Sequence, residues 1–230
     1  MPQLRLCLVT TLATLALTGK LTLAVAQASA PGATAGLPAL HECDSVSHDP
    51  VFFFKHGSAL VSPYLLLSEH PVLGERQHAS ELREGISCLD KAIQLLPSYW
   101  QALWFRGKAY QALGETRAAR DSFQSAFALH PENPDVGREL VIADLDLSEY
   151  REALPIAKGL AETHTKDAGL RANYAVALVL DGQIAAAQAV IADALQLDPS
   201  DGLTRALKAR IDDVANGVRP KPRSVHDLEK

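Results

Sequence analysis

The residues best suited to metal or redox chemistry gather in the first third of the chain. Five of the eight histidines fall between positions 41 and 78, and Cys43 and Asp44 lie among them. Imidazole and thiolate groups ligate zinc and copper, but no two of these residues have the CxxC, HxxxH or HExxH spacing that brings ligands to one ion. We therefore expect dispersed surface histidines, no metal and no cofactor. A metal- or redox-linked module built on His41, Cys43, His48 and Cys88 is the alternative.

Motifs for other chemistry are missing from the sequence. It has no glycine-rich phosphate loop, no G-x-S-x-G elbow and no dinucleotide-binding fingerprint. The net charge is −5, and the 22 basic residues are scattered rather than clustered as a nucleic-acid-binding surface requires. We expect a protein that is not an enzyme and that binds neither nucleic acid nor a small-molecule substrate.

The N-terminal stretch predicts export. Arg5 precedes an apolar run from Leu6 to Leu17, and Lys20 keeps this run below the roughly 20 residues that a membrane-spanning helix needs. Ala24-Val25-Ala26 has the small residues of a signal-peptidase site. Residues 1–26 are therefore predicted to be a cleaved signal peptide, and the mature protein to be periplasmic or secreted. Cleavage after Ala30 is a second reading. An uncleaved anchor, making a membrane-tethered assembly factor that contacts the membrane, is a third.

Cleavage after Ala26 would leave two cysteines in an oxidising compartment. It removes Arg5 and Lys20 and no acid, so the net charge goes from −5 to −7, and it retains Cys43 and Cys88. Such a pair suits a disulfide. Sequence spacing does not supply the distance between Cα atoms that a disulfide requires, so a disulfide and two unpaired thiols both remain open.

The elements that would position these residues follow a repeat of 34. Pro97, Pro131 and Pro199 are separated by 34 and then 68 residues, and Thr165 stands at the skipped position. A period of 34 residues is the length of one helix-turn-helix unit in an array of stacked repeats. The small aromatic content, 6%, also favours closely packed helices over a β-sandwich.

Two windows resemble the tetratricopeptide repeat closely. In the first window, from Trp100 to Pro131, the family pattern is kept by Gly107, Tyr110, Gly114, Ala119, Phe123, Ala126 and Pro131. In the second, from Ala168 to Pro199, it is kept by Ala175, Leu178, Gly182, Ala187, Ile191, Ala194 and Pro199. The window between them is degenerate, with Ser148 and Thr165 in place of glycine and proline.

The resemblance implies an all-α, right-handed helix-turn-helix solenoid. We expect about 3–4 repeats within residues 66–216, at 66–99, 100–133, 134–167 and 168–201, followed by a capping helix at 201–216. Pro71 and Gly74 interrupt the first helix of the first unit.

Segments outside the repeats are expected to be a tether and a tail. Residues 27–65 are predicted to form a tether and an N-terminal cap, in which the apolar run 51–54 covers the open end of the array; an exposed docking patch is the alternative. The Arg- and Lys-bearing residues 217–230 are predicted to be a disordered basic tail.

In this family the first helix of each pair lines the concave face, which implies a protein or peptide partner there. The residues that this places in the partner site are Trp104, Lys108, Gln111, Arg138, Ile142, Leu145, Asn173 and Val176. Glu139 departs from the carboxylate-clamp pattern of the chaperone-binding members, so a peptide helix laid along the apolar part suits the face better. The expected function is an exported scaffold or adaptor, with assembly of an envelope complex as one form of it.

Overall fold

The computed structural model describes residue 43, residues 47–65 and residues 75–229. The predicted signal peptide and most of the tether lie outside these ranges. Within them the chain is entirely helical, which confirms the all-α prediction. The ten helices are α1 (Pro50–Leu65), α2 (Glu75–Leu95), α3 (Trp100–Ala112), α4 (Thr116–Leu129), α5 (Pro134–Asp146), α6 (Tyr150–Thr163), α7 (Ala168–Asp181), α8 (Ile184–Leu197), α9 (Gly202–Ala215) and α10 (Val225–Glu229). None of the described helices combines the length and the apolar character of a membrane span.

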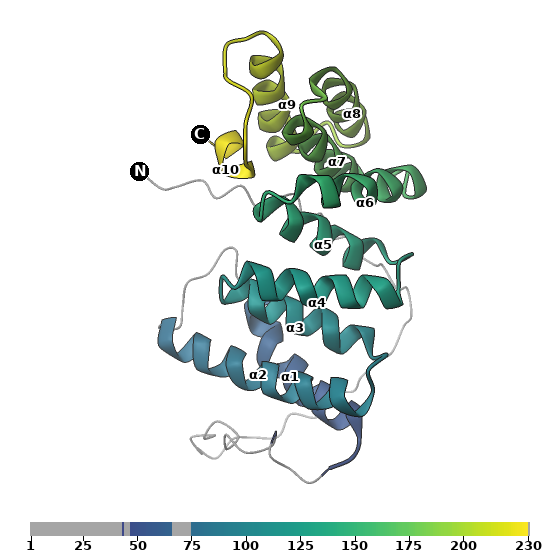
Figure 1. The fold of residues 1–230 in the computed structure, drawn as a ribbon, viewed down its shortest axis with the longest axis vertical. Helices are drawn as coiled ribbons and strands as arrows, with labels where there is room; N and C mark the ends of the chain where they lie inside the picture. The colour runs from purple at the N-terminus through teal and green to yellow at the C-terminus, as the bar shows by residue number, and fades with distance from the viewer. Residues whose placement is uncertain (1–42, 44–46, 66–74, 230) are drawn as a thin grey trace, which may run out of the picture.

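Successive helices pair and the pairs stack into an array (Figure 1). α1 packs on α2, α3 on α4, α5 on α6 and α7 on α8, and each pair also contacts the next. Because a single pair leaves an apolar face uncovered, stacking completes the core. α9 follows the last pair and packs against α8 and α7.

A close approach between helices holds the pair α3/α4 together. Gly107 of α3 faces the fully buried ring of Phe123 on α4, and a Cβ atom at Gly107 would lie 2.6 Å from Cδ1 of that ring. Gly107 and Phe123 are the small and the aromatic residue of the repeat pattern. They contact each other because the ring fills the space that a side chain at Gly107 would take.

The turn that closes the first helix is repeated in every one of the three in-phase units. Gly114 (φ 75°) and Gly182 (φ 88°) take the left-handed conformation there, and Ser148 (φ 60°) takes it midway between them. A serine in this conformation costs more than glycine. The degenerate window nevertheless keeps the geometry of the repeat, because its neighbours on both sides fix where the chain must turn.

The predicted start of the first repeat at residue 66 is wrong. α1 is the first helix of the first pair, and it lies within the segment 27–65 that was expected to be tether and cap. The interruption at Pro71 and Gly74 falls between α1 and α2, outside the described residues. Phe53 of the apolar run is buried in a cluster with side chains of α2 and α3, so the run covers the first repeat instead of forming an open patch.

The predicted disorder of residues 217–230 is also wrong. The chain turns at Gly217 (φ 71°) and ends in α10, whose Val225 and Leu228 are buried. Five residues make too short a helix to be stable in water alone. α10 is ordered because these two side chains enter the same apolar cluster as side chains of α5, α7 and α9.

Cys43 and Cys88 are in disulfide geometry. Their Cα atoms are 4.9 Å apart, within the range that a disulfide spans. The bond joins the residues that precede α1 to the middle of α2, and Lys91 of α2 donates a hydrogen bond to the carbonyl oxygen of Cys43. The N-terminal end of the array is therefore crosslinked.

Candidate partner-binding face

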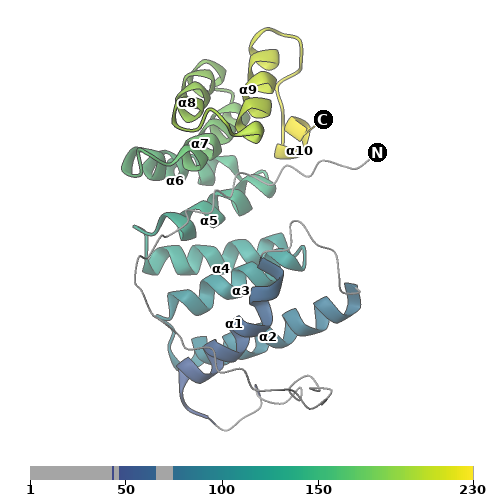
Figure 2. The same cartoon turned by 180° about the vertical axis from the view of Figure 1, so that it is seen from behind.

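The first helices of the pairs line one side of the array. α1 contacts α3, α5 contacts α7, and α7 contacts α9. Among the described residues, second helices of successive pairs make no comparable contact. Helices that approach each other along a curved stack lie on its inner side, so we take the first helices to form the concave face of this stack, which Figures 1 and 2 show from opposite sides. The eight predicted partner-binding residues all belong to α3, α5 and α7.

On α3 the predicted residues join their own unit to the next one. Lys108 Nζ lies 2.8 Å from Glu139 Oε1, and Gln111 donates to the other carboxylate oxygen at 3.3 Å. The Lys108 ammonium also lies 6.0 Å from the centroid of the Trp104 ring. Glu139 is thus neutralised by α3, and the α3 side chains hold α5 in place.

Arg138 is likewise part of a joint between helices. It is 5% exposed, and its Nη2 lies 2.6 Å from Asp167 Oδ2. Asp167 caps α7, since its other carboxylate oxygen accepts from the backbone N–H of Leu170 at 2.9 Å. The pair therefore fixes the start of α7 against α5.

The remaining predicted residues are not open to solvent. Ile142 and Leu145 of α5 and Val176 of α7 are buried, and all three belong to the apolar cluster that also contains Val225 and Leu228 of α10. The sequence predicted an open groove at these positions. In the structure the chain's own C-terminal helix packs against α5, because two apolar side chains of the tail match the apolar surface of the concave face.

Two of the predicted residues, Trp104 and Asn173, have buried polar atoms without a hydrogen-bond partner; in Trp104 this atom is Nε1. The Asn173 side chain is 1% exposed, and neither its Oδ1 nor its Nδ2 has a hydrogen-bond partner. Nearly all buried polar groups in native proteins are paired, because an unpaired one costs about 1–3 kcal/mol. Both polar atoms of the Asn173 amide are therefore left unsatisfied by folding.

A second buried polar group lies at the joint between α4 and α5. Arg120 Nε donates to Asp144 Oδ1 at 2.9 Å, and Asp144 is nearly fully buried. Burial raises the pKa of the Asp144 carboxyl above its ordinary value, against the opposing effect of Arg120. The Arg120–Asp144 pair therefore links α4 to α5.

The residues of the metal alternative are separated or bonded. Cys43 and Cys88 bond to each other, so neither offers a thiolate, and His41 lies outside the described residues. In the part of the chain that the structure describes, no three histidine, cysteine or acidic side chains are grouped as metal ligands would be.

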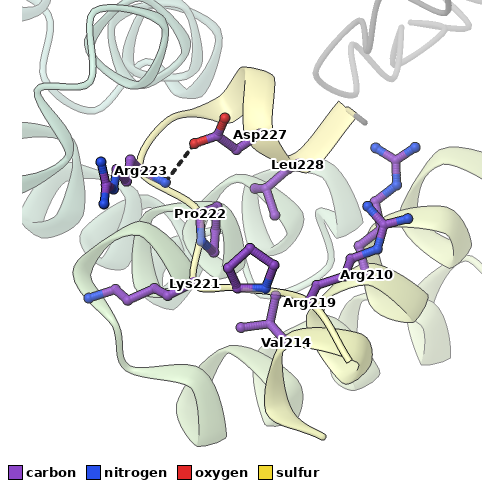
Figure 3. Close-up of a pocket in the computed structure, with 9 residues that line it drawn as sticks. Arg210, Val214, Arg219, Lys221, Pro222, Arg223, Asp227 and Leu228 are labelled. Carbon is purple, nitrogen blue, oxygen red and sulfur yellow. Dashed lines mark hydrogen bonds between the residues drawn. The ribbon is translucent and has the colours of Figure 1, made fainter. Parts of the chain in front are cut away.

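The sequence analysis missed α10, although a local signal for it exists. Ser224 and Asp227 have the spacing of a capping box just before and within the helix. The Ser224 hydroxyl accepts from the backbone N–H of Asp227 at 3.4 Å, and Asp227 Oδ2 accepts from the backbone N–H of Arg223 at 2.9 Å (Figure 3). With Val225 and Leu228 three residues apart, these signals outline a single amphipathic helical turn.

Stacked helix pairs with a concave face of first helices define an α-helical repeat protein. Residues 144–211 match the family model described as tetratricopeptide repeat. Residues 144–211 are therefore identified as tetratricopeptide repeats, as the sequence pattern predicted for them. This fold is consistent with binding to other proteins.

Solved structures show the same fold. YrrB, described as a TPR protein with an unusual peptide-binding site, has a TM-score of 0.62 and 20% identity, covering 80% of this chain and 87% of YrrB. MamA from Desulfovibrio magneticus RS-1 has a TM-score of 0.58 and 18% identity, covering 72% and 86% of the two chains. At these identities the likeness concerns the fold.

Curated relatives match over short stretches. The transcription factor tau 131 kDa subunit of Saccharomyces cerevisiae is 27% identical over 75 residues, which is 33% of this chain and 7% of the relative. The inactive peptidyl-prolyl cis-trans isomerase shutdown of Bombyx mori is 37% identical over 59 residues, 26% of this chain and 13% of the relative. The chain thus spans a small part of either relative's length.

Proposed function

We propose that this protein is an exported, non-catalytic scaffold or adaptor that binds a protein or peptide partner through the concave face of its repeats. The observation that carries the proposal is the buried, unpartnered amide of Asn173 on α7. A peptide backbone has the N–H and C=O groups that would satisfy both ends of this amide.

The apolar character of α5 and α7 favours a peptide over a small polar ligand. Ile142, Leu145 and Val176 belong to one buried apolar cluster, which also contains two side chains of the C-terminal helix. Amphipathic peptides place an apolar face into such grooves. Glu139 is neutralised by Lys108, so this acid does not repel a partner's carboxylate as its sequence position suggested, but neither cation nor acid is free to clamp one.

Export is supported by the signal-like N-terminus and by the cysteines. Disulfides persist in oxidising compartments, and the geometry of Cys43 and Cys88 suits one. We therefore propose a periplasmic or secreted location, with assembly of an envelope complex as the role that such a scaffold would serve. YrrB, described as having a peptide-binding site, supports a peptide partner for this fold by analogy.

Affinity capture with three chains tests this function. Wild type, Asn173→Leu and Gln196→Leu are used as baits in an extract of the native compartment, and captured proteins are identified by mass spectrometry. Both variants exchange an amide for leucine, but Gln196 is exposed on α8, on the outer side of the array. We expect Asn173→Leu to lose a partner that the other two retain. Equal capture by all three chains would contradict a site at α7.

A further inference from the structure

The C-terminal segment turns back onto the array directly after α9. Gly217 takes the left-handed conformation, and the backbone N–H groups of Val218 and Arg219 donate to the carbonyl oxygen of Asp213 at 2.8 and 3.1 Å. The Arg219 side chain also contacts the Asp213 carboxylate at 3.2 Å. These bonds reverse the chain direction, so the residues that follow run back towards earlier repeats.

The segment then crosses three first helices in succession. It lies beside Arg210 and Val214 of α9, with which residues 219–223 line a pocket (Figure 3). Lys221 reaches Gly182, the left-handed residue that ends α7, where the negative end of the helix dipole favours a cation. Finally α10 packs against α5. A peptide bound along the concave face would follow the same course.

Two apolar side chains anchor this course. Val225 and Leu228 are 5% and 2% exposed, whereas His226 and Asp227 of the same helix are exposed. The two anchors lie three residues apart on one helical turn, which places them on one face. They enter the cluster that contains Ile142, Leu145 and Val176, which are predicted partner-binding residues.

Between α9 and α10, Pro220, Lys221 and Arg223 are exposed and Pro222 is buried. A pocket of about 520 Å³ lies between this segment and α9. A five-residue helix gains little from its own hydrogen bonds, so the order of α10 depends on docking.

We propose that residues 218–229 are an internal ligand of the concave face, and that a partner peptide of the same chemistry binds by displacing them. That chemistry is an extended, basic, proline-containing stretch that ends in a helical turn with two apolar residues three positions apart. The choice of face rests on the proposed function. The displacement itself rests on the contacts of α10.

The test uses the full chain and a synthetic peptide of residues 217–230 that carries a fluorescent label. Leu228→Asp puts a charge at a buried anchor and releases α10, while His226→Asp makes the same change of charge at an exposed position of the same helix. Peptide binding to wild type and to both variants is measured by fluorescence anisotropy. A labelled peptide that itself carries Leu228→Asp serves as the control ligand.

We expect the Leu228→Asp chain to bind the labelled peptide about ten-fold or more tightly than wild type or His226→Asp. A tethered segment competes at an effective concentration near the millimolar range, so the free site is a small fraction in wild type. The control peptide should bind none of the chains. Equal binding to all three chains, or no binding to a folded Leu228→Asp chain, would overturn the proposal.

A second variant covers the case in which Leu228→Asp fails to fold. Asp227→Ala removes the hydrogen bond between the Asp227 carboxylate and the backbone N–H of Arg223 without touching the buried anchors, and it should give an affinity between those of wild type and Leu228→Asp. Affinity unchanged from wild type would count against the internal ligand. Failure of the proposed function is seen separately: peptide binding without any captured partner overturns that function alone, and capture without peptide binding overturns the internal ligand alone.

Discussion

Side chains on the concave face fall into two groups. Lys108 and Arg138 form ion pairs with the next unit, at 2.8 Å to Glu139 and 2.6 Å to Asp167, so their position on a ligand-facing helix serves the stacking of repeats. Asn173 has no such partner. The position of a residue in the repeat therefore predicts where its side chain lies along the helix. The hydrogen bonds of that side chain then decide whether it can bind a partner.

Replacing Asn173 should not destabilise the protein. In Asn173→Leu a buried amide without partners becomes an apolar side chain of similar size, so the free energy of unfolding should stay equal or rise by about 1 kcal/mol. Urea denaturation followed by circular dichroism measures this. A loss of more than about 2 kcal/mol would show that the amide has a structural role, and the capture experiment with this variant would then need a different substitution.

At the scale of the element, the contact between Gly107 and Phe123 decides how closely α3 and α4 pack. A methyl group at Gly107 meets a ring that has no exposed surface and no room to move. By contrast, a Cβ atom at Gly159 of α6 would meet nothing within 4 Å. Packing therefore requires a glycine at position 107 but not at position 159.

This contrast predicts effects of opposite sign. Gly107→Ala should destabilise the fold by about 1–3 kcal/mol through overpacking, whereas Gly159→Ala should stabilise it by up to about 1 kcal/mol through helix propensity. Thermal unfolding of the two variants beside wild type checks both. If Gly107→Ala unfolds at the wild-type temperature or above, the close approach of α3 and α4 is not as described.

Elements at the two ends of the array were harder to predict than those in the middle. α1 precedes Pro71 and Gly74, two residues that disfavour a helix, and the 34-residue phase of the sequence does not extend back to it. α10 has only five residues, too few to show helical periodicity. The spacing of Ser224 and Asp227 predicts a helix only if Val225 and Leu228 are known to pack against an apolar surface. Both elements depend on contacts with residues distant in sequence.

At the scale of the whole molecule, the array is a linear stack in which each pair contacts its neighbours. The disulfide between Cys43 and Cys88 crosslinks one end, and α10 packs back from the other end onto α5. Repeat arrays are stabilised by neighbour contacts, so the terminal pairs, which have a neighbour on one side only, gain most from such additions.

Reduction should therefore weaken the N-terminal end. The bond closes a loop of 45 residues, for which the chain-entropy model gives about 4 kcal/mol of stabilisation. We expect reductant to lower the unfolding midpoint of the wild type and to leave unchanged that of a Cys43→Ala, Cys88→Ala double variant. Denaturation with and without reductant, with a thiol assay to establish reduction, provides the measurement. An unchanged midpoint in the fully reduced wild type would argue against a structural disulfide.

The sequence by itself determined the helical repeat, because small residues recur 34 positions apart, as the buried Ala119, Ala153 and Ala187 do. The eight residues predicted from the repeat pattern to lie on first helices do lie on α3, α5 and α7. Only the tertiary structure decided how these side chains are engaged, since Lys108 and Arg138 pair across units, and Ile142 and Leu145 are buried in an apolar cluster that also contains Val225 and Leu228. The physical reason is that periodicity reports the apolar contacts that recur in each unit. Ion pairing and the docking of a terminal segment depend on side chains that do not recur with the repeat.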